Sequence, residues 1–201
     1  RIYTLHNSID ISIINQEEVE YWKEKLGAKL LPTGSLRIKK NKKLSDLSGF
    51  KEGKWWVQDI SSSIPIKLVG KIKNMEVLDL FSAPGGKAMQ LIALGANVTC
   101  IDSSSIRIKK LKENLTRMNM NADVFQTDFY DFKSKKKFDL VLIDVPCSST
   151  GTIRKNKEIQ YLDPFKRLKN LLKIQEDSLN VAKNFVKNKG YILYCISLFF
   201  R

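Results

Sequence analysis

From Glu76 onward, short apolar runs alternate with longer amphipathic stretches at a regular spacing. The runs predict five strands, at residues 76–80, 97–101, 123–126, 138–143 and 190–197. The stretches between them predict helices at 86–94, 106–118 and 164–186. This alternation indicates an α/β fold, a parallel sheet with helices on both faces. Right-handed crossovers then bring the carboxyl ends of all five strands to one rim.

The pattern before this region is different. Residues 1–5 predict a strand, 16–26 an amphipathic helix and 36–38 another strand, with breaks at Gly27, Pro32 and Gly34. We therefore expect a small α+β module at 1–53 and a Rossmann-like domain at 54–201, which opens with a helix at 61–69. Trp55 and Trp56 lie at the boundary between this module and this domain. They suit base stacking, but buried interdomain aromatics are the favoured interpretation.

The most informative segment is Val77–Lys87, VLDLFSAPGGK, a strand that breaks into small residues before a helix. Such a turn lets the backbone approach a ligand at a helix N-terminus. The dinucleotide fingerprint is absent, and Phe81 and Ala88 violate the phosphate-loop pattern. A nucleoside ligand without phosphates fits better, and S-adenosylmethionine is the leading candidate. The alternative is an ordinary strand-to-helix turn.

Acidic residues follow the next three strands: Asp102, Asp128 and Asp144. An acid about 20 residues beyond a glycine turn suits a ribose hydroxyl, and Asp102 lies at that spacing. Asp102 is also placed to cap the following helix. Its assignment to a ribose contact therefore depends on the glycine turn and the three strand-end acids occurring together.

The chain has 201 residues and a net charge of +14, with lysines clustered at 39–43, 109–110 and 133–137. This charge favours a nucleic-acid partner, against the alternative of a solubilising surface. No apolar run approaches the roughly 18 residues of a membrane helix, and the first residues form no secretory signal. Three distant cysteines and one histidine, His6, predict reduced thiols in the cytoplasm and no metal site. They also disfavour Ser-His-Asp chemistry.

Four motifs together resemble the Sun/Nop2 family of RNA cytosine-5 methyltransferases, which includes bacterial ribosomal RNA enzymes. They are the segments at 56–62 (WVQDISS), at 82–87 (SAPGGK), at 101–114 and at 144–154 (DVPCSSTGTIR). The resemblance covers nearly the whole chain and implies a Rossmann-like S-adenosylmethionine-dependent domain with an N-terminal RNA-binding module. It implies a cofactor site formed by Ser82, Ala83, Pro84, Gly85, Gly86, Lys87, Asp102, Arg107, Asp128 and Asp144.

In this family a cysteine after strand five attacks cytosine C6, which makes C5 nucleophilic toward the methyl group. A second cysteine, in the loop after strand four, assists product release. The resemblance thus implies catalytic roles for Cys147, Asp144 and Lys87, with Pro146 shaping the base pocket. Ser197 stands where the first cysteine is expected, and Cys195 two residues earlier is expected to be structural.

The family fold continues with two more strands, whereas this chain stops at Arg201, and it begins with Arg1. We expect a fragment whose C-terminal strands are missing. The first hypothesis is a monomeric enzyme acting on ribosomal RNA, impaired by Ser197. The second is a protein that binds RNA and S-adenosylmethionine without catalysis. The third, an amino-group methyltransferase, is disfavoured because Val145-Pro146-Cys147 lacks the expected second proline and aromatic residue.

Overall fold

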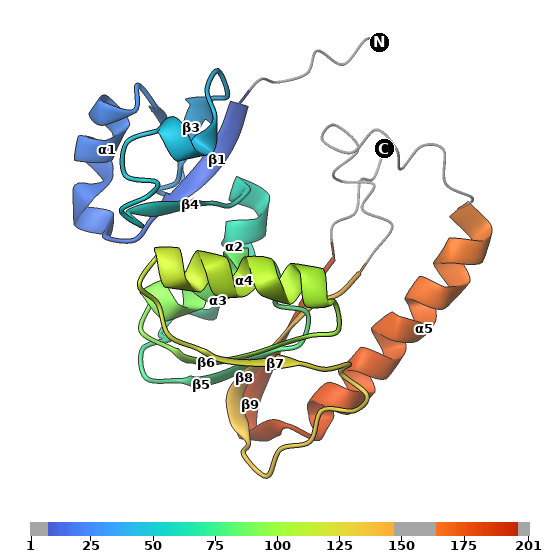
Figure 1. Ribbon diagram of the computed structural model, residues 1–201. Helices are drawn as coiled ribbons and strands as arrows, with labels where there is room; N and C mark the ends of the chain where they lie inside the picture. The colour runs from blue at the N-terminus through green and yellow to red at the C-terminus, as the bar shows by residue number, and fades with distance from the viewer. Residues whose placement is uncertain (1–7, 147–163, 197–201) are drawn as a thin grey trace.

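The computed structural model describes residues 8–146 and 164–196, which form two sheets (Figure 1). The first sheet is antiparallel, with the order β2-β3-β1-β4. Its strands are β1 (Ser8–Ile13), β2 (Lys29–Leu30), β3 (Leu36–Lys39) and β4 (Trp55–Val57). The helical segments of this module are η1 (Gln16–Glu18), α1 (Val19–Lys25) and η2 (Leu44–Asp46).

The two faces of this first sheet differ in polarity, because side chains alternate along each strand. One face buries apolar residues against α1, with Ile11, Leu36 and Trp55 fully buried. The opposite face carries polar side chains from β1 and β3, among them Asp10 and Arg37. On this polar face, Asp10 is buried, whereas Arg37 and Lys39 of β3 are exposed.

The second sheet is parallel, with the order β7-β6-β5-β8-β9. Its strands are β5 (Glu76–Asp79), β6 (Asn97–Asp102), β7 (Asp123–Gln126), β8 (Phe138–Asp144) and β9 (Val186–Cys195). The helices are α2 (Ile60–Val69), α3 (Gly86–Ala93), α4 (Ser105–Arg117) and α5 (Pro164–Lys183). The strand order reverses between β5 and β8, and ligands of such sheets bind at this switch point.

Helices cover both faces of the parallel sheet, as Figure 1 shows with α4 on one face and α5 on the other. α2, α3 and α4 share one apolar core with β5, β6 and β8. α4 contributes Ile108, Leu111 and Leu115 at helical spacing, and the Ser104 hydroxyl caps its start. α5 and phenylalanines such as Phe129 and Phe185 form the opposite core.

The predicted α/β fold is confirmed, and most predicted elements agree with the structure within a few residues. The predicted strand at 1–5 lies outside the described residues. The first described strand is instead β1, whose alternation of polar and isoleucine residues was missed. β9 begins at Val186 rather than at 190, because an irregular register opposite Phe138 and Leu140 lets the strand continue through Gly190. The preceding helix therefore ends earlier than expected, at Lys183.

The two tryptophans at the join lie in different cores, which confirms them as buried aromatics. Trp55 packs in the N-terminal module, while Trp56 packs with α2 and α3. The Trp56 indole Nε1 lies 3.2 Å from both the Gly86 carbonyl oxygen and Gln58 Oε1. Because β4 pairs with β1, residues 55–57 complete the first sheet. The division at residue 53 itself stays a prediction.

Candidate active site

The glycine turn lies at the end of β5 and is held by its neighbouring strands. The Leu80 N–H donates to Leu142 O on β8, and the Ser82 N–H donates to Ile101 O on β6. Gly85 then begins α3 with a φ of 106°, a left-handed conformation. A Cβ at this position would lie 2.5 Å from Leu111 Cδ1. Both its conformation and this close approach to α4 require glycine.

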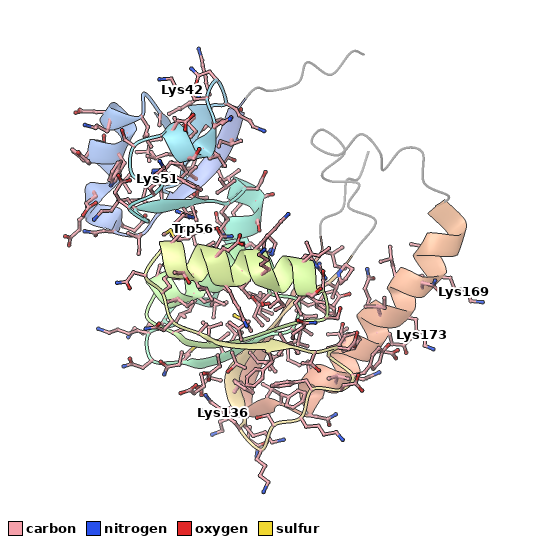
Figure 2. All side chains as sticks on the ribbon, viewed as in Figure 1. Lys42, Lys51, Trp56, Lys136, Lys169 and Lys173 are labelled. Carbon is pink, nitrogen blue, oxygen red and sulfur yellow. The ribbon has the colours of Figure 1, made fainter. Side chains whose placement is uncertain are left out.

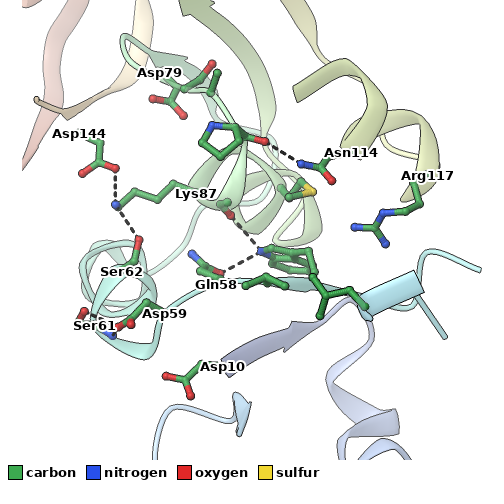
Figure 3. Close-up of a pocket in the computed structure, with 18 of the residues that line it drawn as sticks. Asp10, Gln58, Asp59, Ser61, Ser62, Asp79, Lys87, Asn114, Arg117 and Asp144 are labelled. Atoms are coloured by element: carbon green, nitrogen blue, oxygen red, sulfur yellow. Dashed lines mark hydrogen bonds and ion pairs between the residues drawn. The ribbon is translucent and has the colours of Figure 1, made fainter. Parts of the chain in front are cut away.

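A cavity of about 950 Å³ opens over this turn, between the parallel sheet and the N-terminal module (Figure 3). The domain side contributes residues from the ends of β5 and β8 and from the glycine turn: Asp79, Phe81, Ser82, Ala83, Pro84, Gly86, Lys87 and Asp144. The module side contributes Ser8, Asp10, Arg37, Leu44 and Phe50. The volume is at the upper end for a pocket holding one small ligand, so it leaves room for a cofactor and part of a substrate.

Lys87 and Asp144 form an ion pair in the lining of this cavity (Figure 3). The Lys87 Nζ atom lies 2.6 Å from Asp144 Oδ2 and 2.9 Å from Ser62 Oγ. The lysine is only 9% exposed, so its ammonium group is held by these two partners. Side chains from α2, α3 and β8 thereby meet at the predicted rim.

Two buried carboxylates near the turn have oxygens without a hydrogen-bond partner among the described residues. They are both oxygens of Asp79 and the Oδ2 atom of Asp102. Burial, with a further contribution from nearby Asp144, raises the pKa of Asp79 to about 8. Lys87 and the Phe81 N–H act on that pKa in the opposite direction. Buried acceptors left open in this way suit a ligand that brings its own donors.

The other predicted acidic residues differ in their surroundings. Asp102 is nearly fully buried, and its Oδ1 atom accepts from the Ser104 N–H and from Arg107 Nη2, both at 2.9 Å. Arg107 is thus held against Asp102. Asp128 lies at the turn after β7, where its Oδ1 atom accepts from the Tyr130 N–H at 3.1 Å. Asp102, Arg107 and Asp128 do not line the cavity itself.

Two cavity residues of the N-terminal module, Asp10 and Arg37, were not predicted, whereas Asn114 belongs to the motif at 101–114. Arg37 forms a paired contact with Asp10, whose distances are 2.6 Å for Nε–Oδ1 and 2.9 Å for Nη2–Oδ2. Asn114 on α4 donates to the Pro84 carbonyl at 3.0 Å and so steadies the turn. The N-terminal module therefore supplies a wall of the site, which no local motif indicated.

The predicted catalytic residues Cys147 and Ser197 lie outside the described residues. Cys195, at the end of β9, is buried and pairs in register with Asp144. Burial, with nearby Asp144 and Asp79 also contributing, raises its pKa to about 11, while Lys87 opposes this shift. Cys195 is therefore a thiol at neutral pH, in keeping with the structural role expected for it.

Within residues 8–146 and 164–196, no cluster of three or more His, Cys, Asp or Glu residues is arranged to hold a metal ion. In the same ranges, no helix has both the length and the apolar character needed to span a membrane.

The parallel sheet, the glycine turn at its switch point and the acidic rim define a Rossmann-like methyltransferase domain. The crystal structure of PH0851 is similar to this chain, with a TM-score of 0.85 and 29% identity over 96% of this chain and 47% of that chain. NSun6 from Pyrococcus horikoshii, solved with the S-adenosylmethionine analogue SFG, has a TM-score of 0.76 and shares the fold at 16% identity. Its match covers 94% of this chain and 75% of that chain.

The sequence comparison narrows this class to one family. Residues 68–198 match the family model of the 16S rRNA methyltransferase RsmB/F, and the chain belongs to that family. Ribosomal RNA small subunit methyltransferase B from Photorhabdus laumondii is 33% identical over 153 residues, which are 74% of this chain and 36% of that protein. The protein of the same name from Citrobacter koseri is 32% identical over 165 residues, 80% of this chain and 39% of that protein. The chain thus spans little more than a third of these relatives.

Proposed function

We propose that this chain carries the methyl-donor site and part of the RNA site of an S-adenosylmethionine-dependent cytosine-5 methyltransferase of small-subunit ribosomal RNA. Family membership supports the reaction class. The observation that carries the site assignment is the group of buried, unpartnered carboxylate oxygens on Asp79 and Asp102. Asp79 lines the cavity with the Lys87–Asp144 pair at the switch point of the sheet, and Asp102 ends the neighbouring strand β6 outside the cavity lining.

These residues fit S-adenosylmethionine. The open Oδ2 atom of Asp102 suits a ribose hydroxyl donor, while Arg107 and the Ser104 N–H hold the carboxylate in place. Among the described residues, Asp79 has two oxygens without a hydrogen-bond partner, and its raised pKa keeps the carboxyl group largely protonated at neutral pH; a cationic end of the ligand would favour its ionised form, which accepts with both oxygens. Lys87 and Asp144 hold one another in place in the lining of the same cavity. The bound cofactor would supply an electrophilic methyl group.

The chain must make cytosine C5 nucleophilic, and family resemblance assigns this task to the residue at position 197. Here that residue is serine, whose hydroxyl is a far weaker nucleophile near neutral pH than a cysteine thiol. The sole histidine, His6, lies far away in sequence from this position. We therefore expect slow methyl transfer, with Cys147 retained for product release.

The charge of the chain supports an RNA substrate. A net charge of +14 favours a polyanion, and the basic residue Arg37 of the N-terminal module lines the cavity beside the proposed methyl-donor site. We further propose that the protein acts as a monomer in the cytoplasm, where its buried Cys100 and Cys195 stay reduced.

The function is tested by transfer of labelled methyl groups from S-adenosylmethionine to small-subunit ribosomal RNA, followed by nucleoside mass spectrometry. We expect 5-methylcytosine as the product, with a low rate for the unaltered chain and a higher rate for Ser197→Cys. Cofactor binding is measured in parallel by calorimetry. Methylation of the exocyclic amine, or absence of cofactor binding, would contradict the proposed function.

A further inference from the structure

One face of the N-terminal sheet gathers basic side chains beside the cavity. The strand register places Asp10 opposite Arg37, Ser8 opposite Lys39, and Lys29 opposite Arg37 on the other side. Residues paired in this way share a sheet face, so these five side chains lie together. Arg37, Asp10 and Ser8 line the cavity, while Lys29 and Lys39 are exposed beside it. We call this group the polar sheet face.

Arg37 is held rigidly within the polar sheet face. Its Nε and Nη2 atoms donate to the two carboxylate oxygens of Asp10. Asp10 is only 4% exposed, and its Oδ2 atom also accepts from the Ile60 N–H at the start of α2, at 3.2 Å. The guanidinium group is therefore oriented by the fold before any ligand arrives, which reduces the entropy cost of binding.

The remaining edge of Arg37 is open. Among the described residues, no hydrogen-bond partner is found for its Nη1 atom, and the side chain is 45% exposed. The free Nη1 and Nη2 hydrogens form a fork that matches an acceptor with two adjacent oxygens. A phosphodiester group of an RNA strand has this geometry.

Charge on this face is divided between two roles. Asp10 and Asp59 act on Arg37 electrostatically and offset its positive charge. Arg37 therefore orients a bound phosphate more than it attracts the RNA strand. Attraction comes from exposed lysines, which are Lys29 and Lys39 on the face, followed by Lys40, Lys42 and Lys43 just beyond β3. Figure 2 shows Lys42 at this end of the N-terminal module.

We infer that the polar sheet face guides a single RNA strand into the cavity, and that Arg37 binds a backbone phosphate next to the target nucleotide. This inference rests on the proposed function and adds the residue that sets the register of the strand. Phosphate contacts position a nucleic acid without reading its sequence. The strand would pass from Lys39 over Arg37 toward the Lys87–Asp144 pair.

The inference is tested by fluorescence anisotropy with a labelled single-stranded RNA at several salt concentrations. Arg37→Lys retains the charge and a partner for Asp10 but loses the fork, so we expect about tenfold weaker binding. The matched control is Lys173→Ala, which removes one charge from α5, away from the N-terminal module (Figure 2). This control should weaken binding less than twofold. The urea midpoint and the cofactor affinity of each variant are measured to confirm that the fold and donor site are intact.

A second variant examines the lysines independently of Arg37. The double substitution Lys29→Ala with Lys39→Ala touches only exposed side chains. If each lysine neutralises one phosphate, the log–log salt slope should become shallower by roughly 1.4 for single-stranded RNA.

Binding by Arg37→Lys equal to that of the unaltered chain, or an unchanged salt slope in the lysine variant, would overturn this inference alone. Failure of the unaltered chain to bind RNA would overturn the proposed function as well. Competition by an acidic peptide as strong as by RNA would show that the polar sheet face binds protein instead, and would also overturn the inference.

Discussion

Lys87 on α3 and Asp144 at the end of β8 form an ion pair, with Nζ 2.6 Å from Oδ2. The pair lies at the switch point between β5 and β8, next to the buried Asp79. Lys87 is the cation that acts on Asp79, while Asp144 and Asp102 are the neighbouring carboxylates that raise its pKa. The positive charge of Lys87 thus offsets the negative charge of the carboxyl groups around the proposed methyl-donor site.

Lys87→Met should therefore destabilise the protein more than Asp144→Asn. Loss of the lysine leaves acidic groups facing one another, which costs about 1–3 kcal/mol in the free energy of unfolding. Asp144→Asn leaves Lys87 with Ser62 and with Asp79 nearby. Urea denaturation of both variants checks this order, with Lys110→Met on the exposed side of α4 as a control. Equal losses for the two variants would contradict it.

Gly85 and Gly86 are adjacent, but they should respond oppositely to alanine. Gly85→Ala places a Cβ 2.5 Å from Leu111 Cδ1 and requires a left-handed alanine, so we expect a loss of about 2 kcal/mol or more. Around Gly86 the nearest atom to a new Cβ is Gln58 Cγ, at 3.9 Å. Gly86→Ala should therefore leave the unfolding free energy unchanged or raise it by up to about 1 kcal/mol. Similar losses in both variants would count against the described turn.

Asp79 should make stability depend on pH. Its pKa is raised to about 8 in the folded protein, so the folded state binds one more proton than the unfolded state between about pH 4 and pH 8. The free energy of unfolding should therefore be highest below the unfolded pKa and fall as pH rises to about 8. Over this window the fall is on the order of 3–5 kcal/mol.

Asp79→Asn removes this titration and should flatten the profile. The measurement is urea denaturation at pH 4 to pH 9 without cofactor, with Asp123→Asn at an exposed position of β7 as the control. Parallel profiles for the unaltered chain and Asp79→Asn would show that the buried carboxyl does not titrate in this range.

Asp102 should contribute directly to cofactor affinity. Asp102→Ala removes a buried carboxylate whose Oδ2 atom has no partner among the described residues, and should weaken S-adenosylmethionine binding by roughly 1–3 kcal/mol. Asp128 was also predicted at the cofactor, but within the described part of the chain it has no buried oxygen left without a partner, so Asp128→Ala should have a smaller effect. Titration calorimetry measures both, and an unchanged affinity in Asp102→Ala would remove this residue from the site.

Local patterns predicted the parallel sheet because apolar runs, glycine turns and strand-end acids repeat within short windows. The Lys87–Asp144 contact joins residues 57 positions apart, yet both were found because each belongs to a recognisable motif. The alternation of polar residues with isoleucines in β1 is equally visible in the sequence, but it lies a few residues beyond the strand predicted at 1–5.

The Asp10–Arg37 pair could not be predicted in this way. These residues are 27 positions apart, and neither belongs to a motif. Asp10 and Arg37 come into contact because β1 and β3 pair in a register that places them opposite one another. That register is set when the isoleucines of both strands pack into one core. The sequence pattern places Asp79 in a buried strand. That both of its carboxyl oxygens lack a hydrogen-bond partner among the described residues depends on the tertiary packing around it.

We propose that this domain supports covalent cytosine-5 chemistry and that Ser197 limits its rate. The decisive experiment is covalent trapping on small-subunit ribosomal RNA that contains 5-fluorocytosine, in the presence of S-adenosylmethionine. Fluorine at C5 cannot leave as a proton, so an enzyme–RNA adduct persists and is counted on a denaturing gel. We expect no adduct with the unaltered chain and a clear adduct with Ser197→Cys, because a cysteine is a few per cent thiolate at pH 7. Strong trapping by the unaltered chain that disappears with Cys147→Ala would show that Ser197 is not the limiting residue.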